Sequence, residues 1–273
     1  MFSRALIFSR LDRDDAVKLA EKLASTLQSR GVKTYFEHAL ASRLGVRGVE
    51  PSRVEVDLAV VVGGDGTVLR VIHQLNREVP LFTVSMGKVG FFGEVEPSEA
   101  QSFLAEVLSG RFIQDKCFMV EADVEGFPPA LNEIKIGNEN PQRMVDLSVY
   151  VDGSKVAQDR LDAVLVSTPS GASAYSLSAG ACLVDPRLEV FLIVPVCPLS
   201  ANFKPFIVPS NVKVSIKPEG EAGLLLLADG VVSKRVYPPR TIEIRRSERF
   251  VVFLRRGFTF YERVKRRLRL SSV

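Results

Sequence analysis

The first 110 residues alternate between short apolar runs and segments whose apolar residues recur every three or four positions. Runs of the first kind are typical of buried strands, and the second spacing is typical of helices. The predicted strands are Ala5–Phe8, Val32–Phe36, Val54–Val62 and Val79–Ser85. The predicted helices are Asp12–Gln28, a helix that runs from the glycine turn after Val62 to Asn76, and Pro97–Leu108. Strands and helices in this order predict a parallel sheet with right-handed crossovers.

The pattern changes at Phe112, after which short alternating runs follow one another at intervals of roughly ten residues. Such runs predict an all-β sandwich. Its predicted strands are Cys117–Val124, Leu131–Gly137, Leu147–Val151, Lys155–Arg160, Ala163–Ser167, Val190–Val194, Val212–Lys217, Leu224–Leu227, Val231–Tyr237, Thr241–Arg245 and Phe250–Leu254. Asp152-Gly153 predicts a hairpin turn between two of these strands.

Together these patterns predict a Rossmann-like parallel α/β domain followed by a β-sandwich domain, which is a two-domain α/β plus all-β fold class. We place the α/β domain at residues 1–110 and the β-sandwich at residues 111–254. Residues 255–273 are basic, and a helix is predicted over Phe258–Leu270 that packs back on the first domain. Its apolar residues share one face, and the arginines lie on the opposite face. We interpret the arginine face as solvated.

The buried run that ends at Val62 leads directly into a turn, Gly63-Gly64-Asp65-Gly66-Thr67. Three glycines in four positions let the backbone turn sharply and come close to a ligand. The N-terminus of the helix that follows has free N–H groups and a partial positive charge. Ligands of parallel sheets bind at the carboxyl ends of the strands, where this turn lies. The sequence therefore predicts a phosphate-binding turn.

Asp65 is the unusual residue of that turn, because a carboxylate repels a phosphate unless it binds a metal ion or takes a proton during chemistry. Asp beside Gly is also common in turns and at helix caps. The turn by itself leaves both interpretations open.

Two further segments are rich in small residues. Ser85–Gly93 is a second glycine-rich turn at the same edge of the sheet. Thr168–Ala181 interrupts the strand pattern of the second domain with small and hydroxyl-bearing residues. We interpret it as a loop that enters a short helix and packs against something flat or polar, although composition alone favours ordinary Ser/Thr capping.

Composition narrows the class of protein. The net charge of +4 and the pI near 9.0 favour anionic ligands but are too mild to indicate nucleic acid. The three cysteines are widely spaced and match no metal or redox motif, which favours a reducing cytoplasm. The N-terminal segment turns acidic too early for a signal peptide, and the longest apolar run, Val190–Cys197, is too short to span a bilayer. We expect a cytoplasmic protein without a membrane partner.

Four features together resemble the NAD kinases (ATP-NAD kinases): GGDGT after a buried strand, the turn Gly87–Gly93, Asn132-Glu133 within ALNEIKIG, and TPSGASAYSLSAG. The resemblance extends in order over nearly the whole chain, including the C-terminal YERVKRRL. GGDG alone is weak, because diacylglycerol and sphingosine kinases and 6-phosphofructokinases carry related turns. The combination of the four is specific.

The resemblance implies transfer of the γ-phosphoryl group of ATP, or of polyphosphate, to the adenosine 2′-hydroxyl of NAD, giving NADP. It assigns Asp65 as the base on that hydroxyl. The residues implied in phosphate and ATP binding are Gly63, Gly64, Gly66 and Thr67. Those implied in NAD binding are Asp65, Gly66, Arg70, Asn132, Glu133, Arg160, Asp162, Ser173, Ala174, Tyr175 and Ser178.

Some of these residues have specific implied roles. Asn132 and Glu133 bind ribose hydroxyls of NAD, and Asp162 accepts a hydrogen bond from the nicotinamide carboxamide. Arg160 lies near a phosphate or a neighbouring subunit. The chain departs from the family pattern at Ala172, at Ala181-Cys182, at Leu199 and at Val231, and the last two leave the choice between NAD and NADH open.

The residues of the chain also fit the chemical requirements of a kinase. Phosphoryl transfer requires positioning, neutralisation of phosphate charge and a carboxylate within reach of the alcohol. The chain has neither GxxxxGK[ST] nor GxGxxG, which weakens a dehydrogenase interpretation. We expect Mg²⁺ or another divalent metal to arrive with ATP, because no carboxylate cluster indicates a preformed metal site.

Two other classes remain as alternatives: a GGDG-type lipid kinase and a non-catalytic nucleotide-binding regulator. The first lacks an apolar membrane-facing stretch, and the second would not need Asp65, whose charge hinders phosphate binding. We also expect a homodimer or homotetramer built through the β-sandwich, partly from the resemblance and partly because the faces of its many strands need cover.

Overall fold

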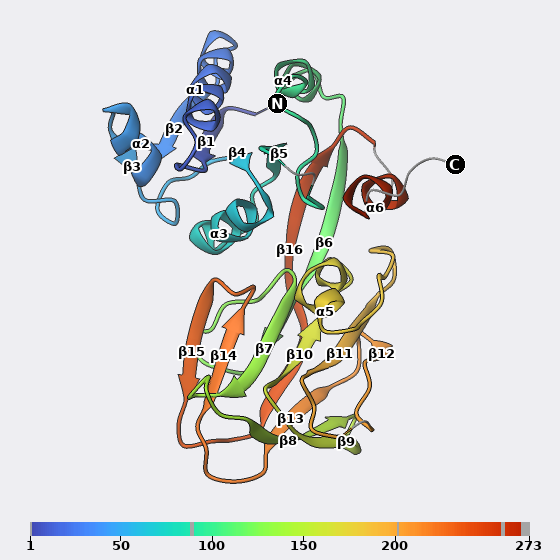
Figure 1. Ribbon diagram of the computed structural model, residues 1–273. Coiled ribbons are helices and arrows are strands. Elements are labelled where there is room, and N and C mark those ends of the chain that lie inside the picture. The colour runs from blue at the N-terminus through green and yellow to red at the C-terminus, as the bar shows by residue number, and fades with distance from the viewer. Residues whose placement is uncertain (1, 88–89, 201, 258–259, 269–273) are drawn as a thin grey trace. The chain divides into compact units, whose positions relative to one another are not determined.

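The computed structural model describes residues 2–87, 90–200, 202–257 and 260–268 (Figure 1). The chain forms two compact units: unit 1 comprises Met1–Lys116 and Val251–Val273, and unit 2 comprises Cys117–Phe250. Two strands, β6 (Ile113–Ala122) and β16 (Ile242–Arg255), carry the chain from one unit to the other.

Unit 1 is built on a parallel sheet with the strand order β3-β2-β1-β4-β5. Its strands are β1 (Arg4–Ser9), β2 (Lys33–Glu37), β3 (Gly48–Val49), β4 (Leu58–Gly63) and β5 (Leu81–Ser85). Phe253, near the end of β16, pairs with Leu81 of β5 in the same parallel sense. All residues of β4 and β5 are buried, because helices cover the sheet. The predicted parallel α/β sheet is confirmed.

The helices of unit 1 are α1 (Asp14–Ser29), α2 (His38–Leu44), α3 (Asp65–Leu75), α4 (Ala100–Leu108) and α6 (Phe260–Leu268). In α1 the residues at helical spacing from Ala16 to Leu27 are buried, and Gly31 follows with φ +79°. The N-terminal end of α4 differs from the prediction, because Pro97 lies in a turn before the helix. The ends predicted for the last helix, Phe258 and Leu270, and the turn residues Lys88 and Val89 lie outside the described residues.

Helix α2 and strand β3 were not predicted. The Glu37 carboxylate caps α2 by accepting the Leu40 N–H at 3.1 Å, and Gly45 ends the helix in the left-handed region at φ +67°. The helix has only seven residues. Such a segment is too short to show a repeated apolar spacing, so its caps are the only local signal.

Unit 2 contains two antiparallel groups of strands. One sheet has the order β12-β11-β10-β7-β14-β15, and the other group has the order β16-β13-β8-β9. Its strands besides β6 and β16 are β7 (Glu133–Asn138), β8 (Val145–Val151), β9 (Ser154–Leu161), β10 (Ala163–Ser167), β11 (Val190–Val196), β12 (Phe206–Pro209), β13 (Val214–Pro218), β14 (Leu224–Ala228) and β15 (Val232–Val236). The predicted hairpin between β8 and β9 is confirmed, with Asp152 at φ +47° and Gly153 at φ +80°.

The core of unit 2 is shared by the facing sides of its strands. Ile136 of β7 and Phe191 of β11 pack in the same cluster as Val149 of β8 and Ile216 of β13, and all four are 0% exposed. This shared core makes the unit a sandwich of two sheets, which confirms the predicted architecture. The segment between β10 and β11 contains a short 3₁₀ turn, η1 (Gly171–Ser173), and one turn of helix, α5 (Tyr175–Ser178).

Candidate active site

The glycine turn of unit 1 joins the buried strand β4 to α3, which begins at Asp65. A Cβ on Gly63 would lie 2.5 Å from Oγ1 of Thr67, so only glycine fits there. Gly64 and Gly66 instead face open space, since no described atom lies within 4 Å of the point where either would carry a Cβ. Thr67 and Val68 donate their N–H groups to the Gly64 carbonyl and so begin the helix. The turn therefore presents bare backbone at a helix N-terminus, as an anion site requires.

A cavity of about 530 Å³ lies against this turn. Its lining residues are Arg10, Leu11, Asp12, Gly64, Gly66, Thr67 and Arg70. The Arg10 N–H donates to the Val62 carbonyl at 2.9 Å, which holds the segment after β1 beside the end of β4. Two arginines and a helix N-terminus line this space, which suits a polyphosphate chain.

The Arg10 side chain is held by Asp12. Its Nε donates to one carboxylate oxygen at 2.8 Å and its terminal nitrogen to the other at 2.5 Å. The hydrogen bond from Arg10 lowers the pKa of Asp12 to about 2. A carboxylate that stays ionised keeps the guanidinium oriented, so Arg10 is preorganised at the cavity.

The Asp65 carboxylate contacts the second glycine turn. Its two oxygens accept the N–H groups of Phe91 at 3.0 Å and Phe92 at 3.1 Å. A Cβ on Gly90 would clash with that carboxylate, so this position requires glycine as well. The two turns singled out in the sequence thus meet at Asp65, and the carboxylate is held in one orientation.

In unit 2, the Asn132-Glu133 segment is fixed through its backbone. The Asp229 carboxylate accepts the N–H groups of Leu131 at 2.9 Å, Asn132 at 2.6 Å and Glu133 at 3.3 Å. Asp229 is 8% exposed and has φ +53°, in the turn between β14 and β15. The segment before β7 is therefore held by a turn distant in the sequence.

The side chains of this segment lack partners among the described residues. Asn132 Oδ1 and Glu133 Oε2 are buried without a hydrogen bond to any residue that the structure describes. Burial, followed by the charge of Asp229, raises the pKa of Glu133 to about 8. Buried polar atoms that remain unpaired are costly, so two of them on neighbouring residues indicate a site for a polar ligand.

The segment Thr168–Ala181 packs directly on Asn132-Glu133. Thr168 donates through Oγ1 to the Leu131 carbonyl at 2.5 Å and through N–H to the Asn132 carbonyl at 2.8 Å. Ser167 Oγ donates to that same Asn132 carbonyl at 3.0 Å. A Cβ on Gly171 would clash with it. The hydroxyl-rich composition thus serves a close approach of two backbones, rather than helix capping alone.

Tyr175 lies at the start of α5 and is 39% exposed. The ammonium of Lys135 lies 5.5 Å from its ring centroid. Burial raises the pKa of Tyr175, and the charges of Cys197, Asp162 and Glu133 raise it further. The carboxyl groups of Asp162 and Glu133 therefore act electrostatically on Tyr175. The Oγ of Ser176 is fully buried beside it and has no partner among the described residues.

The other implied residues are placed as follows. Ser173 donates through Oγ to the Ser170 carbonyl at 3.2 Å, Ala174 links η1 to α5, and Ser178 is exposed at the end of α5. Arg160 lines a different cavity, of about 610 Å³, with Arg143 and Glu219 among its neighbours. The structure does not group it with Tyr175. The two apolar departures, Leu199 and Val231, are 72% and 41% exposed.

Sequence reasoning missed residues that only the fold brings to these sites. Arg10 reaches the glycine turn because β1 and β4 are parallel neighbours. Asp229 reaches Asn132 across 97 positions of sequence. The signal for Asp229 is the Asp-Gly pair itself, which favours a tight turn with positive φ.

Residues 2–87, 90–200, 202–257 and 260–268 include no group of three or more His, Cys, Asp or Glu side chains that is placed to hold a metal ion. Over the same ranges no helix combines the length and apolarity needed to cross a bilayer.

Similarity to known proteins extends over both units. Residues 5–112 match the ATP-NAD kinase N-terminal domain, and residues 131–256 match the ATP-NAD kinase C-terminal domain. The NAD kinase of Methanoculleus marisnigri is 35% identical over 97% of this chain and 99% of its own length. That of Thermococcus gammatolerans is 36% identical over 96% of this chain and 98% of its own length.

Solved structures agree. The crystal structure of an NAD kinase from Archaeoglobus fulgidus in complex with ATP has a TM-score of 0.79 at 27% identity, over 98% of this chain and 96% of that one. The yeast NADH kinase complexed with NADH has a TM-score of 0.89 over 99% of this chain and 89% of that one. At 20% identity, the yeast enzyme supports the fold alone.

Proposed function

The chain belongs to the ATP-NAD kinase family and is a phosphotransferase that phosphorylates NAD, and we propose that Asp65 is the general base on the adenosine 2′-hydroxyl. The observation that carries the proposal is the Asp65 carboxylate, oriented by two backbone N–H groups at the start of α3. It adjoins residues that line a cavity with two arginines. A fixed carboxylate next to a phosphate site is what an alcohol acceptor requires.

The donor binds at the turn between β4 and α3. The backbone of Gly64 and Gly66, the Thr67 hydroxyl and the free N–H groups of α3 hold the phosphates of ATP. Arg10 and Arg70 neutralise phosphate charge, which phosphoryl transfer demands above all. Magnesium would enter bound to the phosphates of ATP, because both oxygens of the Asp12 carboxylate in the cavity lining already accept from Arg10.

Phosphoryl transfer then takes place as a single displacement at the γ-phosphorus. The 2′-oxygen forms a bond to the γ-phosphorus as the bond from that phosphorus to the bridging oxygen breaks, and ADP leaves with the electron pair. The hydroxyl proton passes to Asp65. Ionised Asp65 is regenerated when it returns that proton to water.

The acceptor is recognised by unit 2. Asn132 Oδ1 and Glu133 Oε2 bind ribose hydroxyls of NAD and thereby gain the partners they lack among the described residues. Because its pKa is raised to about 8, Glu133 is a neutral carboxyl at pH 7 and can both donate and accept. A vicinal diol, which also donates and accepts, is a matching ligand.

The remaining roles follow the same scheme. Tyr175 offers its half-exposed ring to a flat group, and Asp162 accepts from the nicotinamide carboxamide. Ser173, Ala174 and Ser178 contribute the small surface of that segment. Arg160, in its separate cavity, suits the alternative of a neighbouring subunit better than a phosphate of the same NAD.

We further propose a homodimer or homotetramer in the cytoplasm. An assembly through unit 2 would cover exposed apolar residues of its surface, such as Ile207 on the edge strand β12 and Leu188. The free cysteines Cys182 and Cys197 are compatible with a reducing compartment. Light scattering tests the assembly, and a mass near 30.1 kDa at micromolar concentration contradicts it.

Incubation with Mg-ATP and NAD, with NADP as the measured product, is the test of the function. A parallel incubation with diacylglycerol tests the lipid-kinase alternative, and one with polyphosphate tests the donor. Formation of 2′-phosphorylated NAD is the expected outcome. Nucleotide binding without turnover would indicate a regulator, and activity with polyphosphate but with no nucleoside triphosphate would exclude ATP as the donor.

A further inference from the structure

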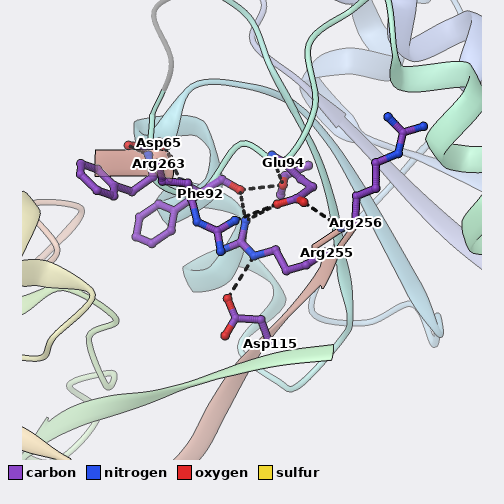
Figure 2. A network of polar contacts seen from close by, with 9 residues as sticks. Asp65, Phe92, Glu94, Asp115, Arg255, Arg256 and Arg263 are labelled. Atoms are coloured by element: carbon purple, nitrogen blue, oxygen red, sulfur yellow. Dashed lines mark hydrogen bonds and ion pairs between the residues drawn. The ribbon is translucent and has the colours of Figure 1, made fainter. Parts of the chain in front are cut away.

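Phe92 is bonded to two different parts of unit 1 through its backbone. Its N–H donates to the Asp65 carboxylate at 3.1 Å. Its carbonyl accepts from the terminal nitrogen of Arg255 at 3.1 Å and from Oγ1 of Thr83 at 2.7 Å. The residue that orients the catalytic carboxylate is thus itself held from the other side (Figure 2).

Arg255 is the centre of this second set of contacts. It is the last residue of β16 and only 5% exposed. Besides the Phe92 carbonyl, it donates to Glu94 at 3.2 Å and, through Nε, to Asp115 on β6 at 3.0 Å. Its guanidinium also lies 4.5 Å from the Phe253 ring centroid, and that ring stacks on Phe92. Polar and stacking contacts therefore both aim Arg255 at Phe92.

Glu94 extends the contacts into the C-terminal segment. Its side chain is 0% exposed. One oxygen accepts from Arg255 and from Arg263 of α6, the latter at 2.9 Å, and the other accepts the backbone N–H of Arg256 at 2.7 Å. The Glu94 N–H in turn donates to Oγ1 of Thr83. Both carboxylate oxygens of Glu94 therefore accept hydrogen bonds, which a buried carboxylate requires.

We propose that Arg255 is a positioning residue for phosphoryl transfer: by holding the Phe92 carbonyl it keeps the Phe91 and Phe92 N–H groups aimed at Asp65. Through Glu94, the same contact makes the orientation of Asp65 depend on the C-terminal segment from Arg255 to α6. The proposal rests on the proposed role of Asp65 as the base.

The physical reason lies in the rigidity of the guanidinium. Its planar fork donates from two nitrogens in fixed directions, from Nε to Asp115 on β6 and from Nη1 to the Phe92 carbonyl and to Glu94, whereas a lysine ammonium is a single nitrogen on a flexible stem. A base must stand within hydrogen-bond reach of the hydroxyl, and small misplacements of a reacting group cost much of the rate. A loose Phe92 would therefore reduce turnover more than it reduces binding.

The first test is Arg255→Lys, with Arg256→Lys as the matched control. Arg256 is the next residue and also makes part-buried ion pairs, but its side chain binds Glu99 and Glu106, not Phe92. We expect Arg255→Lys to lower kcat about 10- to 100-fold, with KM for ATP and for NAD changed about threefold at most. Arg256→Lys should lower the melting temperature and leave kcat within about twofold. Equal effects of both variants on kcat would overturn the proposal.

A second pair of variants tests the same carbonyl if Arg255→Lys does not fold. Thr83→Val removes the other donor to Phe92 without a change of shape, and Thr83→Ser retains it. We expect a loss of about 3- to 10-fold in kcat for Val and recovery for Ser. Loss of stability in both with kcat unchanged would mean that these contacts serve the fold alone, and the proposal would be wrong.

A double-mutant cycle separates this inference from the function on which it rests. If Arg255 acts through Asp65, Arg255→Lys has no further effect on kcat in an Asp65→Asn background. A full additional loss there contradicts the positioning role but leaves Asp65 as the base. An Asp65→Asn enzyme with nearly normal kcat contradicts the base itself, and with it both proposals.

Discussion

Asp65 and Asp229 are carboxylates that both accept backbone N–H groups of another segment, yet they do so in contrasting settings. Asp229 is 8% exposed and receives three N–H groups from residues 131–133. Asp65 is half-buried and receives two, from Phe91 and Phe92. The Asp229 carboxylate fixes the backbone of residues 131–133. The Asp65 carboxylate instead adjoins residues that line a cavity.

The difference extends to the neighbouring side chains. At Asp229 the backbone is satisfied, while Asn132 Oδ1 and Glu133 Oε2 are left without partners in the described part of the chain. At Asp65 the backbone N–H and carbonyl of Phe92 are both hydrogen-bonded, and the carboxylate is the group that we propose as the base. In the proposed function, the region around Asp229 prepares side chains for binding, and the region around Asp65 prepares a single carboxylate for proton transfer.

The largest expected effect comes from Asp65→Asn. We expect kcat to fall by about 10²–10⁴-fold, because the proton acceptor is lost, while ATP binds as well as before or slightly better. An asparagine oxygen can accept only one of the two N–H groups, so the free energy of unfolding should fall by about 1 kcal/mol. Single-turnover kinetics, ATP titration and denaturant unfolding measure these three quantities.

Two outcomes would contradict this interpretation of Asp65. Turnover within a few-fold of wild type would make it a turn residue. Loss of nucleotide binding together with a large loss of stability would make it a structural residue similar to Asp229.

The next effect is that of Asp229→Asn, which tests the other side of the comparison. We expect KM for NAD to rise about tenfold and the free energy of unfolding to fall by about 2–3 kcal/mol, because a buried charged acceptor of three N–H groups is weakened. KM for ATP should not change. A drop in kcat as large as that of Asp65→Asn, with KM for NAD unchanged, would make Asp229 part of the chemistry instead.

These two sites also show how far the sequence leads. The fold class and the two glycine turns follow from local spacing, because strand periodicity and glycine clusters are properties of neighbouring residues. Asp65 is the unusual residue of its own turn, but its role as the base is implied by the family resemblance, because the turn alone also fits a helix cap. Its contact with Phe91 and Phe92 joins two turns that the sequence could only place at one sheet edge.

Contacts across long separations are not predictable in this way. Arg255 and Phe92 are 163 positions apart, and Asp229 and Asn132 are 97 apart. In the sequence Arg255 is one of many basic residues near the C-terminus, yet in the fold it is almost fully buried. Partners of this kind are selected by strand order, such as the pairing of β16 with β5, which no local pattern specifies.

A smaller effect is expected from Arg10→Met, which tests the cavity beside the glycine turn where we propose that ATP binds; we call it the donor cavity. We expect KM for ATP to rise about tenfold through loss of one charge-assisted contact to phosphate, with KM for NAD unchanged. Arg4→Met is the matched control, since Arg4 lies on the adjoining strand β1 and pairs with Glu55 at the surface. Equal changes for both substrates in Arg10→Met would mean that Arg10 does not act at the donor cavity.

The smallest effect on turnover is expected from Glu133→Gln, because glutamine resembles the neutral carboxyl present at pH 7. We expect kcat and KM for NAD within about fivefold of wild type at that pH.

The free energy of unfolding tests the protonation of Glu133 more sharply than turnover does. The pKa of Glu133 is raised in the folded protein from 4.5 to about 8, first by burial and then by the charge of Asp229. The folded state therefore binds the proton more tightly than the unfolded chain does.

The sign of the pH dependence follows from that difference. The stabilisation due to protonated Glu133 is complete below about pH 4.5 and is lost as the pH rises through about 8, because the unfolded chain releases its proton first. Relative to wild type, Glu133→Gln should therefore gain stability by a few kcal/mol between these pH values and change no further above them. Denaturant unfolding of both proteins at pH 5, 6.5, 8 and 9 measures the difference.

In an Asp229→Asn background the gain in stability from Glu133→Gln should end at a lower pH, since one cause of the raised pKa of Glu133 is removed. A difference between wild type and Glu133→Gln that does not vary with pH would mean that Glu133 is ionised in the folded protein, and would require a carboxylate, not a neutral carboxyl, to bind the ribose hydroxyls.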